Sequence, residues 1–140
     1  MILYLDTSSI VKLYIEESGA DAVRRWVEDA EVLASCRVAY PEFISALSRR
    51  LRAGDISKKD FRLLVDGFSK QWQDFASIDF DELEAGRLAE RYGLRGLDAV
   101  HLSALKVLKG ADANIAPVFT SFDLELNKAA VCEGFTIMTP

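Results

Sequence analysis

Apolar and polar positions follow one another along the chain in blocks that predict strands and helices. Residues Met1–Leu5 form an uninterrupted apolar run that stops at Asp6, which is typical of a short strand buried on both faces. Three small polar residues follow, and apolar side chains then recur at helical spacing from Ile10 to Ile15. This spacing predicts a helix with a polar cap directly after the first strand.

The same succession of strand and helix continues to the end of the chain. Further strands are predicted at residues 32–35, 75–78, 117–122 and 135–138. Apolar stripes predict helices at residues 41–53, 61–72, 83–92, 97–108 and 124–133. Strands that alternate with helices of this length predict an α/β fold with a parallel sheet and helices on both faces. We expect a single domain over residues 1–140, because no linker, repeat or low-complexity segment interrupts the pattern.

Acidic residues stand where such a fold places its functional crevice, at the carboxyl ends of the strands. Four of them come from separate parts of the chain: Asp6, Glu42, Asp98 and Asp123. Hard divalent cations such as Mg²⁺ and Mn²⁺ take oxygen ligands of this kind. Packing four carboxylates together without a cation would raise their pKa values and cost stability, so a cluster of these acids implies a metal.

Helix capping is the alternative explanation for each of these acids taken alone. An acid at a helix N-terminus stabilises the helix by about 0.3–1 kcal/mol, and Asp is a preferred N-cap residue. Asp79, Asp81 and Glu82 also follow a predicted strand and open a helix, so local pattern does not separate them from Asp6. Position after a strand is therefore suggestive only.

Four segments of the chain carry a family resemblance: LYLDTSSIVKLY, YPEFISALSRR, LDAVHLSALK and FTSFDLELNKAAVCEGF. In this order they resemble the PIN-domain ribonucleases, and within that family most of all the toxins of VapBC-type toxin–antitoxin pairs. The resemblance covers essentially the whole chain. It implies a three-layer α/β/α sandwich with a central parallel sheet, and an endoribonuclease that hydrolyses RNA phosphodiester bonds with one or two Mg²⁺ or Mn²⁺ ions.

The family's acidic residues map onto the same four positions of this chain, whereas Asp79 and Asp81 fall where the family has no ligand. We expect Asp6 and Asp98 to bind the metal directly. Glu42 and Asp123 either bind it or orient metal-bound water. The catalytic set that the resemblance implies is Asp6, Glu42, Asp98, Asp123 and Ser121, the last being a small hydroxyl residue beside the site. Thr7 and Ser8 match the polar residues that follow the first acid.

Two further features lie near these motifs. His101, the only histidine, stands three residues after Asp98, and we interpret it as a buried structural residue outside the site. Residues 49–62 hold six Lys and Arg against two Asp. This basic stretch is interpreted first as solvated helix ends, with a rim that contacts RNA phosphates as the alternative.

Composition restricts how the chain can bind nucleic acid. The 22 acids outnumber the 17 bases, giving a net charge of −5, which excludes RNA binding by bulk electrostatics.

Half of the residues are apolar, enough for a sizeable core, yet no apolar run approaches the roughly 18 residues that a membrane span needs. The two cysteines form no metal-ligand or disulfide pattern, so we expect a cytoplasmic protein without membrane contact. The resemblance also implies a small cognate antitoxin and a homodimer.

Other function classes fit the sequence less well. A haloacid-dehalogenase type of phosphatase would need a second Asp at position 8, which is Ser8. A receiver domain would need paired acids at the first strand end, and neither a G-x-G-x-x-G motif nor a P-loop is present. The remaining alternative is a non-catalytic PIN-fold module that binds RNA or protein.

Overall fold

The computed structural model describes all 140 residues and contains one five-stranded parallel sheet. The strands are β1 (Ile2–Leu5), β2 (Val32–Cys36), β3 (Ala76–Ile78), β4 (Val118–Thr120) and β5 (Thr136–Met138). Their order across the sheet is β3-β2-β1-β4-β5. The α/β fold with a parallel sheet is therefore confirmed, and β1 is its central strand.

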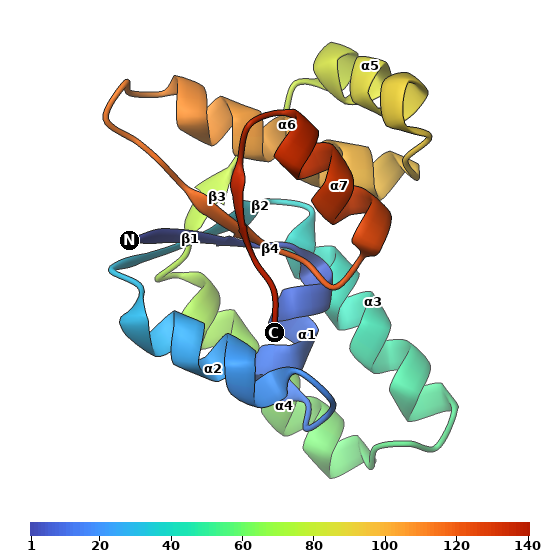
Figure 1. Cartoon of the computed structure of the whole chain (residues 1–140). Coiled ribbons are helices and arrows are strands. Elements are labelled where there is room, and N and C mark those ends of the chain that lie inside the picture. Colours follow the sequence, from blue (N-terminus) through green and yellow to red (C-terminus); the bar gives the residue numbers. More distant parts are fainter.

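Seven helices cover the two faces of the sheet. They are α1 (Thr7–Tyr14), α2 (Ala20–Asp29), α3 (Ala39–Arg52), α4 (Lys58–Trp72), α5 (Glu82–Tyr92), α6 (Gly96–Gly110) and α7 (Leu124–Cys132). Figure 1 shows α1–α4 on one side of the strands and α5–α7 on the other, which makes a three-layer α/β/α sandwich. No helix has both the length and the apolar character needed to cross a membrane.

The side chains of β1 alternate between two separate cores. Leu3 and Leu5 pack with the first four helices, in a cluster that also holds the fully buried Phe68 of α4. Tyr4 points to the opposite face and packs with Phe119 and with residues of α5, α6 and α7. Because successive side chains of a strand face opposite ways, one short apolar run supplies both cores. The all-apolar pattern of this strand follows from that burial on both faces.

The structure differs from the predicted elements in two places. It contains the helix α2, which was not predicted, and Val23 and Trp26 of this helix pack on the core. The strand predicted at 117–122 is shorter, because β4 ends at Thr120. Beyond this point the Phe122 amide donates to Ser8 Oγ at 3.0 Å, so the chain leaves the sheet and bonds to α1.

The sheet order places the site. From β1 the chain proceeds outward to β2 and β3 on one side, and then returns to β4 and β5 on the other. The carboxyl ends of the neighbouring strands β1 and β4 therefore meet where the order reverses. In open α/β sheets this is the position at which ligands bind.

Candidate active site

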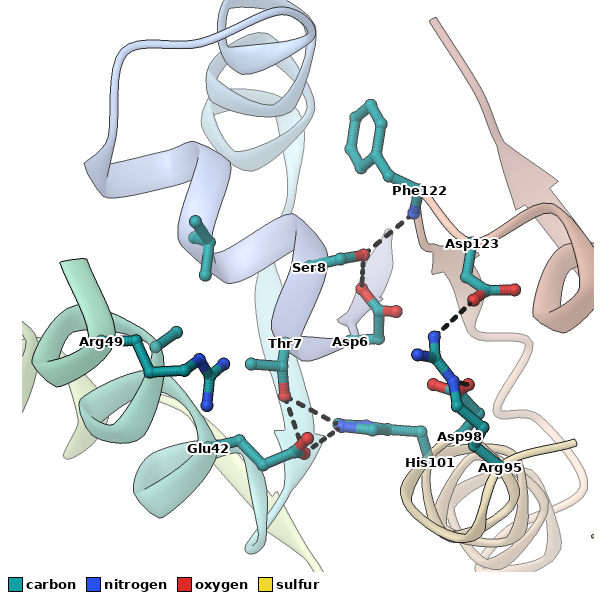
Figure 2. Close-up of a pocket in the computed structure, with 12 residues that line it drawn as sticks. Asp6, Thr7, Ser8, Glu42, Arg49, Arg95, Asp98, His101, Phe122 and Asp123 are labelled. Atoms are coloured by element: carbon teal, nitrogen blue, oxygen red, sulfur yellow. Dashed lines mark hydrogen bonds and ion pairs between the residues drawn. The ribbon is translucent and has the colours of Figure 1, made fainter. Parts of the chain in front are cut away.

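A cavity of about 400 Å³ lies at the carboxyl ends of β1 and β4. All four acids that the sequence singled out line it: Asp6, Glu42, Asp98 and Asp123. Figure 2 shows these side chains arriving from different elements, with Asp6 between the other acids. The structure therefore brings the four predicted acids together, while their chemical roles stay predictions.

Asp6 is the most firmly held of these acids. Its Oδ1 accepts hydrogen bonds from Ser8 Oγ at 2.6 Å and from the Ser9 amide at 3.0 Å, and the second of these caps α1. Its Oδ2 accepts from Ser121 Oγ at 2.5 Å. The side chain is almost fully buried at the end of the central strand. Three donors thus fix the carboxylate in one orientation.

Ser121 connects Asp6 with Asp123. While its hydroxyl donates to Asp6, its Oγ also accepts from the Asp123 amide at 3.0 Å. Asp123 Oδ1 caps α7 by accepting from the Leu126 amide at 2.9 Å, and its Oδ2 is left for another partner. Ser121 is itself buried and does not line the cavity, so it acts on the site through the two acids.

Asp98 lies in the first turn of α6 and pairs with Arg95, the residue that precedes the helix. Arg95 Nε is 3.2 Å from Asp98 Oδ2, and Arg95 Nη2 is 3.1 Å from Asp123 Oδ2. Burial raises the pKa of the Asp98 carboxyl, and the negative charges of Asp123 and Asp6 raise it further, although the Arg95 guanidinium acts the other way. Asp98 is thus close enough to Asp123 and Asp6 for their charges to repel its own.

Glu42 is held by two donors that converge on one oxygen. Thr7 Oγ1 donates to Glu42 Oε1 at 2.8 Å, and His101 Nε2 lies 2.9 Å from the same oxygen. His101 Nδ1 is 3.0 Å from the Tyr4 hydroxyl in the core. His101 is buried, as the sequence predicted, but it also lines the cavity.

Capping and membership of the site are not alternatives in this structure. Asp6 and Asp123 cap helices, and Asp81 caps α5 in the same way by accepting from the Glu84 amide. Asp81 nevertheless follows the edge strand β3 and does not line the cavity. Asp79 pairs with Arg37. Asp79 and Asp81 are also exposed, whereas Asp6 is buried at the end of the central strand.

One cation of the basic stretch 49–62 lines the cavity. Arg49 points towards it from α3 (Figure 2), and its only side-chain hydrogen bond is to Ser45 Oγ. Arg50 instead pairs with Glu17, and Arg62 pairs with Asp66. The larger part of the stretch is therefore solvated helix surface, and Arg49 alone fits the alternative of a phosphate-contacting rim.

The donor set of the cavity fits a hard divalent cation. Apart from the ring of His101, its lining side chains offer carboxylate and hydroxyl oxygens, and burial together with the charges of Asp123 and Asp6 raises the pKa of Asp98. The fit is one of donor chemistry and not of spacing, because no three His, Cys, Asp or Glu side chains are grouped closely enough in the structure to hold a metal. The positive charge between Asp98 and Asp123 is that of Arg95.

Sequence reasoning missed two relationships in the site. The sequence pattern gave no sign that Arg95 pairs with two of the acids, as the structure shows. The contact of His101 with Glu42 was also missed, although its spacing of three residues from Asp98 puts both on one face of α6.

The sequence is similar to known proteins over most of its length. A family model described as PIN domain matches residues 3–131. Ribonuclease VapC49 of Mycobacterium tuberculosis is 35% identical over 114 residues, which cover 76% of each chain. Ribonuclease VapC46 of the same organism is 29% identical over 138 residues, covering 99% of this chain and 97% of the relative.

Solved structures show the same fold. FitAcB from Neisseria gonorrhoeae superimposes with a TM-score of 0.72 at 17% identity, covering 100% of this chain and 98% of that one. PAE2754 from Pyrobaculum aerophilum superimposes with a TM-score of 0.68 at 21% identity, covering 97% and 89%. At these identities the likeness shows the three-layer architecture alone.

Proposed function

The chain belongs to the PIN-domain family, and from this premise we propose that it is a metal-dependent endoribonuclease, the toxin of a VapBC-type toxin–antitoxin pair. The family match confirms the resemblance carried by the four sequence segments. The observation that supports hydrolysis best is the convergence of four carboxylates on one cavity at the strand ends. A module that only binds RNA has no need to hold acids against their mutual repulsion.

In this proposal the acids hold Mg²⁺ or Mn²⁺, as one or two ions. When bound, the ion supplies Lewis-acid chemistry at the phosphodiester and activates water for in-line attack. Asp6 and Asp98 serve as direct ligands, and Glu42 and Asp123 as ligands or as acceptors that orient water. Ser121 holds Asp6 and Asp123 in fixed positions relative to one another through its two hydrogen bonds. No side chain is required as a nucleophile.

The protein has a negative net charge, as its proposed RNA substrate does. Arg49 and Arg95 are the two arginines that line the cavity, and we assign them to the RNA phosphates nearest the scissile bond. The overall charge of −5 makes bulk attraction of RNA unfavourable. Affinity therefore comes from the ion and these local cations.

Partners follow from the family resemblance. A small cognate antitoxin that blocks the site and a homodimer are both part of the proposal, and the VapC relatives support the first of these. We also place the protein in the cytoplasm, because both cysteines are free thiols, which suits a reducing compartment.

The deciding experiment is cleavage of a defined panel of tRNA, rRNA and mRNA fragments, with Mg²⁺, with Mn²⁺ and with EDTA. We expect the wild type to cut with either metal and not in EDTA. Asp6→Asn should abolish cleavage and keep the fold, because Asn is also a good N-cap residue for α1. Asp98→Asn should abolish cleavage too.

Asp81→Asn is the matched control. Asp81 caps α5 as Asp6 caps α1, but it lies outside the cavity, so this variant should cut like the wild type. Undiminished cleavage by both Asp6→Asn and Asp98→Asn would refute the assignment of the site. A wild type that binds RNA and cuts none of the panel with either metal would favour the non-catalytic module.

A further inference from the structure

The buried histidine of α6 joins four separate elements at the wall of the cavity. His101 Nδ1 lies 3.0 Å from the hydroxyl of Tyr4 in β1, and its Nε2 lies 2.9 Å from Glu42 Oε1 in α3. The same Nε2 lies 3.1 Å from Thr7 Oγ1 at the start of α1. Only 2% of the residue is exposed, so these contacts are made away from bulk water.

The chemistry of the partners sets the direction of these hydrogen bonds. An ionised Glu42 carboxylate only accepts, so both Thr7 Oγ1 and His101 Nε2 must donate to its Oε1. The Tyr4 side chain is fully buried, and burial keeps the pKa of its hydroxyl well above the usual range. A protonated Tyr4 hydroxyl donates to Nδ1, which leaves the ring proton on Nε2, facing Glu42.

The two donors have an unequal effect on the two oxygens of Glu42. Oε1 takes both hydrogen bonds, and Oε2 accepts none from the protein. Figure 2 shows Thr7 and His101 meeting at the same end of the carboxylate, beside the cavity that Glu42 lines. The two contacts hold the plane of the carboxylate in one orientation, in which one oxygen is bonded to the protein and the other is free.

We propose that His101 is a positioning residue, which with Tyr4 behind it and Thr7 beside it fixes Glu42 so that Oε2 is the oxygen presented to the cavity. The assignment rests on the proposed function of the site, and it goes further by naming the oxygen of Glu42 that serves the ion or its water. It also replaces the interpretation of His101 as a purely structural residue. Outer partners of this kind typically change activity by about 10–100-fold.

The chain offers a direct physical test, because His101 is its only histidine. Isotope-labelled histidine in the full-length, metal-free protein gives ring-nitrogen NMR signals from one residue alone. We expect a proton on Nε2 and none on Nδ1, and Tyr4→Phe should broaden or shift the Nδ1 signal. A proton found on Nδ1 overturns the proposed direction, whatever the enzyme does.

Two substitutions separate positioning from packing. The amide nitrogen of His101→Gln reaches the place of Nε2 and keeps a donor to Glu42, whereas the shorter His101→Asn reaches only the place of Nδ1. We expect His101→Gln to retain kcat within about threefold and His101→Asn to lose about 10–100-fold in kcat, with KM for RNA little changed in both. Melting in EDTA gives the stability of each variant independently of metal and substrate.

The comparison of the two variants decides the matter. Equal kcat values overturn the assignment, whether both variants match the wild type or both fall together with their melting temperatures. A wild type that fails to cleave any RNA would instead refute the proposed function, and the NMR result would still report the contact between His101 and Glu42. If His101→Asn does not fold, Thr7→Val removes the other donor to Oε1. It should lower kcat without raising KM, and an unchanged kcat counts against the proposal.

Discussion

Arg95 and Asp98 form an ion pair at the start of α6, with Arg95 Nε 3.2 Å from Asp98 Oδ2. The same guanidinium reaches Asp123 Oδ2 at 3.1 Å. A cation of the chain itself therefore lies between two acids that the proposed function assigns to a divalent ion. Because the Arg95 side chain is 82% exposed, it can leave these acids without disturbing the core.

Removing this guanidinium should strengthen metal binding. Arg95→Gln abolishes a positive charge that competes with the ion, and exposed ion pairs are worth about 0.2–1 kcal/mol each. We therefore expect Mn²⁺ to bind about two- to fivefold more tightly, measured as the midpoint of thermal stabilisation during a Mn²⁺ titration. Arg91→Gln is the control, since Arg91 is an exposed arginine that pairs with Glu133. Equal or weaker Mn²⁺ binding by Arg95→Gln would contradict the competition.

Asp98 should destabilise the metal-free protein at neutral pH. Its pKa is raised by burial and by the charges of Asp123 and Asp6, so the folded state favours the protonated carboxyl. The protonated Asp98 carboxyl stabilises the folded state in acid, and this stabilisation is lost as pH rises from the ordinary Asp range through the raised pKa. In EDTA at neutral pH, Asp98→Asn should melt at or above the wild-type temperature, and the difference should shrink in acid.

Mn²⁺ should reverse this order, because the ion stabilises only a protein that binds it. Melting curves of both proteins in EDTA and in Mn²⁺, across the pH range, provide the measurement. Asp79→Asn changes an exposed acid that pairs with Arg37 and serves as the control for loss of charge. A Mn²⁺ gain that Asp98→Asn retains in full would remove Asp98 from the metal site.

Local periodicity was sufficient to predict the fold class. The apolar run of β1 and the stripes of the later helices predicted the parallel sheet with two helical layers, and both are confirmed. The helix-capping pattern is equally local. It did not distinguish Asp6, a site residue, from Asp81, because both cap a helix that follows a strand. The resemblance to the PIN family made that distinction, and the strand order now supplies its physical reason.

Contacts between distant parts of the chain were beyond the reach of the sequence pattern. Ser121 and Asp6 are 115 residues apart, and His101 and Tyr4 are 97 apart. Their hydrogen bonds depend on which strands become neighbours and on how α6 is turned against the sheet. For the same reason the pattern of charges suggested a basic rim at 49–62 without indicating that Arg49 alone faces the cavity.

Ser121→Ala should reduce cleavage by about 10–100-fold, because the Ser121 hydroxyl orients Asp6, a proposed metal ligand. The variant removes the donor to Asp6 Oδ2 and the acceptor for the Asp123 amide. Ser103→Ala is a matched control, since Ser103 is equally buried but bonds to the backbone of Asp81 outside the cavity. Cleavage rates at saturating Mn²⁺ and melting temperatures are measured for both. If the two variants lose activity equally, Ser121 has no special role.

Arg49 and Arg52 form a natural pair for testing the phosphate contact. Both are exposed on α3, and each donates to a serine four residues earlier, Ser45 and Ser48. Only Arg49 lines the cavity. A difference in RNA binding between their variants therefore reports the position of the arginine relative to the cavity, because the lost charge and the helix environment are the same in both.

Arg49→Gln should raise KM for RNA with little change in kcat, because a phosphate contact contributes to binding of substrate and transition state alike. The loss of one such contact should also reduce the salt dependence of RNA binding, by about one in the slope of log affinity against log salt. Steady-state cleavage and binding to the catalytically inactive Asp6→Asn protein, both across a range of salt concentrations, measure these effects. Arg52→Gln should leave KM and the slope unchanged. An equal response of the two variants would show that the rim acts through diffuse charge, and Arg49 would then have no assigned phosphate.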